Sequence, residues 1–182
     1  MRKKLFIVTL LAAALTSAVP AAAAMPASGE LDDSQVASIT QNCAQAQATL
    51  RNLQKRDTVL RINRGRLYDM TLRQTGAFVA RLNAHKVEAP RVKELDSAIR
   101  SEYQKFILSY DRYGDSLNAV IILDCKQKPH EFYEGLAQVA DDRRAVADNV
   151  ATIKQKIGEY SSELTALRDQ EFPEKGLSLI HI

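Results

Sequence analysis

The stretch FYEGLAQVADDRRAVADNVATIKQKIGEYSSELTAL, residues 132–167, decides the fold, because its apolar residues recur three and four positions apart. This spacing puts them on one face of an α-helix and is typical of helices that pack as coiled coils. The seam positions are Phe132, Leu136, Val139, Arg143, Val146, Val150, Ile153, Ile157, Tyr160, Leu164 and Leu167. Arg143 is the one polar exception. Because Pro129 suits a first helical turn, the pattern predicts a helix over about 129–170.

A second seam follows Pro90 and predicts a helix over about 90–124. Its positions are Val92, Leu95, Ile99, Tyr103, Phe106, Tyr110, Tyr113, Leu117 and Val120. The tyrosines at this spacing are interpreted as core residues whose hydroxyls reach the rim, and the alternative is a ligand pocket lined by them.

The segment before these two, about 32–85, carries a weaker helical pattern. The apolar positions of its stripe are Ile39, Cys43, Ala46, Leu50, Leu53, Leu60, Leu67 and Phe78. Polar residues fall on the same stripe at Asp57, Arg64, Thr71, Gln74 and Arg81. With turns near 86–89 and 125–129, residues 32–172 are expected to form an all-α domain, an elongated antiparallel three-helix coiled-coil-like bundle.

The N-terminus predicts export. Three basic residues (2–4) precede the apolar run LFIVTLLAAALTSAV (5–19), and Ala22 and Ala24 fit the small-x-small rule for cleavage between Ala24 and Met25. The run is shorter than the ~20 residues that a membrane-spanning helix needs. We therefore expect a signal peptide at 1–24, a flexible N-terminus at 25–31, and a periplasmic, cell-surface or extracellular location.

The last six residues match a sequence that is encoded by laboratory DNA. LSLIHI (177–182) is what the DNA string CTG TCT CTT ATA CAC ATC encodes, which is a transposon end used in preparing sequencing libraries. We expect 173–182 to be a disordered tail and 177–182 to be adapter sequence. Association with a membrane is expected only through an anchor in native sequence beyond Gly176.

The net charge does not indicate a nucleic-acid partner, and the uneven distribution of charge along the chain has two interpretations. The chain has 25 Lys and Arg against 22 Asp and Glu, and removal of 1–24, with three basic residues and no acids, makes it neutral, which gives no indication of nucleic-acid binding. Residues 51–86 are nevertheless basic and 131–174 acidic. The two segments are interpreted as neighbouring helices that neutralise each other. The alternative is an exposed basic face for an anionic envelope polymer or lipid surface, formed by Arg51, Lys55, Arg56 and Arg66.

The two cysteines are expected to form a disulfide, because export leads to an oxidising compartment. In a hairpin, Cys43 and Cys125 lie about 43 and about 35 residues from the first turn, a mismatch of ~12 Å at ~1.5 Å per residue. That exceeds the ~4.4–6.8 Å Cα separation of a disulfide. The mismatch closes if the first helix ends earlier, near Asn83, or if Cys125 has left its helix.

No pattern indicates catalysis or a cofactor. His130, Glu131 and Glu134 resemble the H-E-x-x-H zinc motif, but Glu134 stands where the second histidine belongs. His130 and Glu134 would supply two metal ligands where zinc needs three or four protein ligands. No metal site and no enzyme activity is therefore expected.

Several short motifs give the chain a resemblance to a known group. They are NC (42–43), LQKRD (53–57), Gly65-x-x-Tyr68, LDC (123–125) and PHEFYEGL (129–136). Together they resemble exported helical proteins of unknown function from small-genome candidate-phylum bacteria. The resemblance implies export and a helical bundle, with cysteines at similar places, and it implies no activity.

These patterns lead to a functional hypothesis, a noncatalytic extracytoplasmic scaffold or interaction module with a protein or envelope partner. One alternative is a periplasmic chaperone-like binder of unfolded chains, which needs an exposed apolar or basic concave face. The other is a truncated ligand- or metal-sensing helical domain of a membrane-anchored protein.

Overall fold

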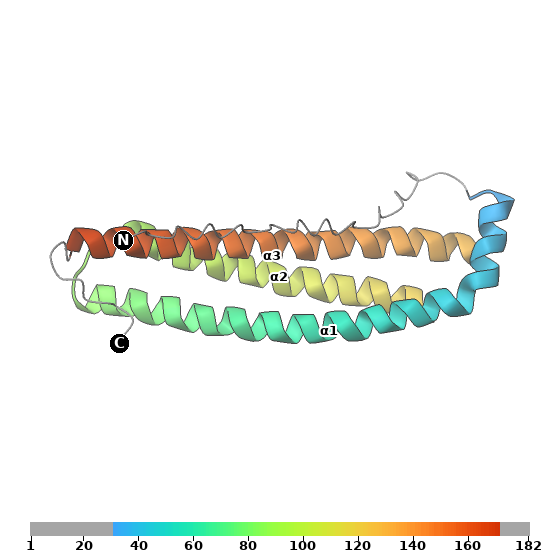
Figure 1. Ribbon diagram of the computed structural model, residues 1–182, viewed down its shortest axis with the longest axis horizontal. Coiled ribbons are helices and arrows are strands. Elements are labelled where there is room, and N and C mark those ends of the chain that lie inside the picture. Colours follow the sequence, from blue (N-terminus) through green and yellow to red (C-terminus); the bar gives the residue numbers. More distant parts are fainter. Residues whose placement is uncertain (1–30, 172–182) are drawn as a thin grey trace, which may run out of the picture. The chain divides into compact units, whose positions relative to one another are not determined.

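The computed structural model describes residues 31–171, which form three helices and no strand (Figure 1). The helices are α1 (Asp33–Ala84), α2 (Pro90–Ile122) and α3 (Pro129–Glu171). These bounds lie within two residues of the expected 32–85, 90–124 and 129–170, and the all-α class is confirmed. The predicted cleavage between Ala24 and Met25 and the predicted tail at 173–182 lie outside the described residues.

Local sequence fixes where each helix begins. Asp32 caps α1, because its Oδ1 accepts from the Gln35 N–H at 2.8 Å while the Gln35 side chain accepts from the Asp32 N–H at 2.9 Å. Pro90 and Pro129 begin α2 and α3, where a missing N–H leaves no helical bond unmade. Between α1 and α2, Lys86 takes a positive φ of 57°, the conformation that ends many helices.

The core is centred on α2. Its contact with α3 is the most extensive, its contact with α1 is smaller, and α1 and α3 touch least. Every position of the predicted α2 seam is buried except Tyr103, which is partly buried. In the α3 seam Phe132, Val139, Val146, Ile153 and Tyr160 are buried. The predicted α2 seam and alternate positions of the predicted α3 seam therefore form the core.

The stripe predicted for α1 is wrong at Leu60 and Leu67, while Phe78 of the same stripe is partly buried and packs against the core. Leu60 and Leu67 are 43% and 51% exposed, and the buried residues beyond Asp57 are instead Tyr68, Leu72, Thr75 and Leu82. Eleven residues separate Asp57 from Tyr68 where a heptad pattern would continue with seven. A straight helix has ~3.6 residues per turn, so a strict seven-residue repeat drifts by ~20° per heptad, and an eleven-residue step corrects the drift. Leu60 and Leu67 are left outside the core.

Two glycines on α3 have different environments, one packed closely against α2 and one at open surface. A Cβ at Gly135 would lie 2.5 Å from Cγ2 of Val120 on α2, whereas nothing lies within 4 Å of a Cβ at Gly158. Gly135 therefore permits the close approach of α3 to α2, and Gly158 serves no packing role.

This difference predicts opposite effects of the same substitution. Gly158→Ala should raise the free energy of unfolding by ~0.5–1 kcal/mol through helix propensity. Gly135→Ala should lower it by ~1–3 kcal/mol, because Val120 must move out of its packed position. Urea unfolding followed by circular dichroism measures both. Changes of the same sign would show that Gly135 is not a contact point between α2 and α3.

Candidate functional site

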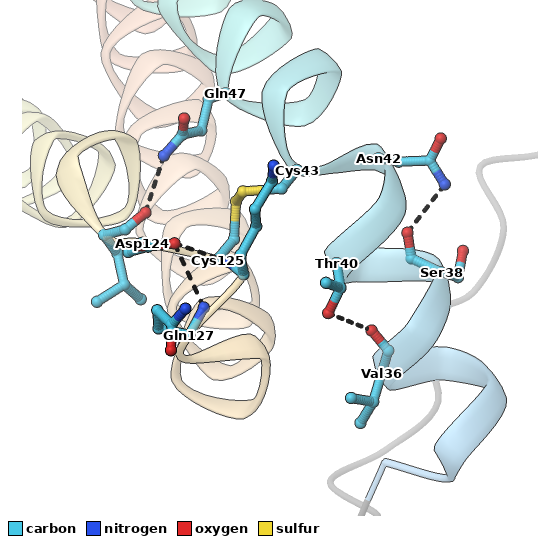
Figure 2. Close-up of a disulfide and its surroundings, with 11 residues drawn as sticks. Val36, Ser38, Thr40, Asn42, Cys43, Gln47, Asp124, Cys125 and Gln127 are labelled. Atoms are coloured by element: carbon cyan, nitrogen blue, oxygen red, sulfur yellow. Dashed lines mark hydrogen bonds between the residues drawn. A yellow bond between two sulfur atoms is a disulfide. The ribbon is translucent and has the colours of Figure 1, made fainter.

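The disulfide joins α1 to the segment that follows α2, and Figure 2 shows the bond between the two sulfur atoms. Cys43 lies on α1 and Cys125 lies three residues beyond the end of α2, with their Cα atoms 5.6 Å apart. Of the two ways to close the predicted height mismatch, the structure has the second, since Cys125 has left the helix. Both residues are buried in the larger of two apolar clusters.

Hydrogen bonds shape the loop around Cys125. Asp124 Oδ1 accepts from the backbone N–H of Lys126 at 3.0 Å, which forms an Asx turn, and the Asp124 carbonyl accepts from the Lys128 N–H at 2.9 Å. Gln47 of α1 donates to the Leu123 carbonyl at 2.8 Å. The loop is thus bound to α1 by a covalent bond and by a hydrogen bond one helical turn further along.

A buried polar layer centred on Asp57 crosses all three helices. The Asp57 carboxylate accepts from the Tyr113 hydroxyl at 2.8 Å and from Nε of Arg143 at 3.0 Å, and the Asp57 carbonyl accepts from the Tyr110 hydroxyl. Burial, and then the bond to Asp57, raises the pKa of Tyr113. Burial, followed by the charge of Asp57, raises the pKa of Tyr110. The tyrosine hydroxyls bond inward here, which corrects the prediction that they reach the rim.

A second polar layer lies nearer the α1–α2 turn. The Asp96 carboxylate accepts from the Thr75 hydroxyl at 2.5 Å and from Nε of Arg100 at 3.0 Å. Arg100 also donates to the Leu72 carbonyl at 3.0 Å, which is possible because Gly76 has no Cβ; one there would lie 2.4 Å from Nη2 of Arg100. The apolar seams give no indication of this layer, although Asp96 and Arg100 stand four residues apart, a spacing that brings side chains together on a helix.

These two layers suit a structural role. Asp57 and Asp96 each bond to a hydroxyl and a guanidinium from within the chain. Buried polar groups that can be satisfied in only one alignment are a known means of fixing the register between helices. We therefore place the candidate functional site on the surface.

The residues of the proposed basic face do not share one side of α1: by helical spacing Arg51, Lys55 and Arg66 lie together, and Arg56 lies toward α3. Arg51, Lys55, Arg56 and Arg66 are exposed, and no ion pair within residues 31–171 involves any of them. The interpretation that basic residues of α1 neutralise acidic residues of α3 is not supported by ion pairs, since no base of α1 pairs with an acid of α3 within the described residues. Within the described residues the ion pair between these helices joins an acid of α1, Asp57, to a base of α3, Arg143.

Apolar side chains share this part of α1. Within twelve residues the helix exposes five large ones, with exposed fractions between 43% and 56%, namely Val59, Leu60, Ile62, Leu67 and Met70. An apolar cluster of this kind, interspersed with basic residues, is characteristic of a surface that contacts a partner.

A groove between α1 and α3 begins where this apolar cluster ends, at Thr71, and has a volume of about 520 Å³. Its apolar lining includes Phe78, Ile157 and Leu164, and Arg81 lies at its edge. The hydroxyl of Tyr160 donates to the Thr75 carbonyl across its floor at 3.4 Å, and burial raises the pKa of Tyr160 to about 12. The groove exists because α1 and α3 have little direct contact.

Within the described part of the chain, the structure brings no further ligand to the candidate metal-binding residues. His130 and Glu134 are exposed on the first turns of α3, and Glu131 pairs with Lys128 at 2.9 Å. Among residues 31–171 no group of three or more potential ligands is close enough to hold a metal ion. In the same range, no helix combines the length and apolar character needed to cross a bilayer.

Comparison with protein-family models, with curated proteins and with solved structures finds no significant match.

Proposed function

We propose that this protein is a noncatalytic, extracytoplasmic interaction module that holds a partner on the outer side of α1 and the adjoining groove. The observation that carries this proposal is the set of five exposed apolar side chains between Val59 and Met70, close to Arg56 and Arg66, which form no ion pair within residues 31–171. Burying such side chains on a partner releases ~25 cal/mol per Å² of apolar surface, so their exposure gives a partner something to gain.

The same proposal includes the setting in which the surface works. Residues 1–24 act as a signal peptide that is removed on export, and the three helices form an antiparallel coiled-coil-like bundle in the periplasm, at the cell surface or outside the cell. The Cys43–Cys125 pair supports an oxidising compartment, since disulfides persist there and are reduced in the cytosol.

Photocrosslinking in cells that make and export the protein tests this function. A benzophenone amino acid at Met70 should give one discrete crosslinked product, because Met70 is 52% exposed within the apolar cluster. The matched control is the same label at Leu108, which is 64% exposed on α2. No product at Met70, or equal products at both positions, would contradict the proposal. A broad ladder of products from Met70 alone would favour the chaperone-like alternative, since such a binder holds many chains.

A further inference from the structure

The seam of α3 is only half covered by the other helices. Its positions fall into two sets, each repeating every seven residues. One set is buried at Phe132, Val139, Val146, Ile153 and Tyr160 and partly buried at its last position, Leu167. The other is partly or fully exposed and contains Leu136, Arg143, Val150, Ile157 and Leu164. A coiled-coil seam is normally covered on both sets, so α3 has room for one more neighbour.

The edge of α1 that borders the groove also carries apolar residues that no other described helix covers. Leu60 and Leu67 are exposed, and Leu67 stands four and seven residues before Thr71 and Gln74, which line the groove. Positions four and seven apart share one face of a helix. Leu60 and Leu67 thus share a helix face with residues that line the groove on α1, and Ile157 and Leu164 of the exposed α3 set line it from the other side. In a four-helix bundle this is the position of the helix that lies opposite α2.

The exposed charges on these two edges are basic. By helical spacing, Arg56 and Arg81 belong to the α1 edge, and Lys154 and Arg168 to the α3 edge. Exposed acids of α3, such as Asp141 and Asp148, lie about half a turn away from Ile157, on the far side of that helix. A partner that fits must therefore present apolar residues to the two stripes and acids to the two edges.

We propose that an acidic amphipathic helix of a partner protein docks lengthwise in the groove between α1 and α3 and completes a four-helix arrangement. This inference rests on the proposed function and specifies the partner. The α3 set runs ~42 Å from Leu136 to Leu164 at ~1.5 Å per residue, which matches a partner helix of about four heptads. Such a helix would lie in the groove at its Ile157–Leu164 end and over the Arg143–Asp57 pair further along. Leu at the seam positions and Glu or Asp beside them gives the required chemistry.

Two other occupants fit the surface less well. A second copy of the chain exposes acids beside large apolar residues on α2, but there Leu108 and Ile122 stand fourteen positions apart, which does not make a continuous apolar stripe. A bilayer surface would reach the outer side of α1 but not Ile157 and Leu164, which line a groove between two helices. An acidic helix fits both the basic edges and the concave shape of the groove.

Binding of a designed peptide to the oxidised protein tests the inference. The probe is a labelled peptide of about four heptads with Leu at both seam positions and Glu at both flanking positions, and its control carries Lys in place of Glu. Fluorescence anisotropy at low salt should show saturable binding of the Glu peptide and none of the Lys peptide. Binding should weaken as salt rises, because exposed charges are screened over ~8–10 Å at ~0.10–0.15 M salt.

Matched variants locate the binding. Leu60→Glu combined with Leu67→Glu should weaken the Glu peptide about tenfold or more, while Leu108→Glu, the same change on exposed α2 surface, should leave it unchanged. Circular dichroism of both variants checks that they fold as the wild type does.

Three results would overturn the inference: no binding of the Glu peptide, equal binding of the Lys peptide, or equal loss in Leu108→Glu. Binding of the wild type to phosphatidylglycerol vesicles, lost in the double variant when the peptide does not bind, would assign the surface to a membrane instead. A discrete crosslink at Met70 without peptide binding would overturn this choice of partner and leave the proposed function standing.

Discussion

Replacing either cysteine by serine should lower the free energy of unfolding of the oxidised protein by about 4 kcal/mol. The bond closes a loop between residues separated by 82 positions, and a loop of that length restricts the unfolded chain by roughly this amount in the chain-entropy model. The bond also holds a loop that is otherwise bound to α1 mainly through the Gln47–Leu123 hydrogen bond. Urea unfolding, with and without reductant, measures the effect.

The two single variants serve as controls for each other. Cys43→Ser, Cys125→Ser and the reduced wild type should have similar stabilities, because all three lack the same bond. Full stability in the reduced wild type would show that the bond contributes little, and two titratable thiols in the folded, oxidised protein would show that it does not form.

Replacing Asp57 by alanine should cost about 2–4 kcal/mol. The substitution leaves the buried Tyr113 hydroxyl without its acceptor, which costs ~1–3 kcal/mol, and it also removes the partner of Arg143. Arg143 is half exposed and can turn toward water, which limits its share of the loss. The matched control is Asp69→Ala on the same helix, where an exposed pair with Arg73 contributes ~0–1 kcal/mol.

A double variant separates the two parts of this loss. Tyr113→Phe in the Asp57→Ala background should recover part of the stability, because it removes the hydroxyl that lacks an acceptor. If Asp57→Ala cost no more than Asp69→Ala, the Asp57 layer would not hold the helices together.

The cores of α2 and α3 could be predicted from the sequence because their seams are long and almost wholly apolar. Polar exceptions were the informative positions. Asp57 on the first stripe and Arg143 on the third each interrupt an apolar pattern, and the structure pairs them at 3.0 Å. Two isolated polar residues on facing seams can satisfy each other, but the sequence does not give the relative height of the helices that would identify the pair.

The surface of α1 could not be predicted, because the pattern continued as heptads where the helix takes an eleven-residue step. Leu60 and Leu67 are of a residue type that is usually buried, but they lie on the surface. Basic character at Arg51, Lys55, Arg56 and Arg66 was evident from the sequence, but the absence of ion pairs for these four within residues 31–171 depends on where α3 places its acids.

Carbene footprinting of the oxidised protein, read out residue by residue by mass spectrometry, tests the orientation of α1 on which the groove and its partner depend. The structure predicts strong labelling of Leu67, which is 51% exposed, and weak labelling of Leu72, which is 8% exposed. An unbroken heptad pattern would instead bury Leu67 and leave Leu72 outside the seam. Stronger labelling of Leu72 than of Leu67 would contradict the orientation of α1 and remove the docking groove with it.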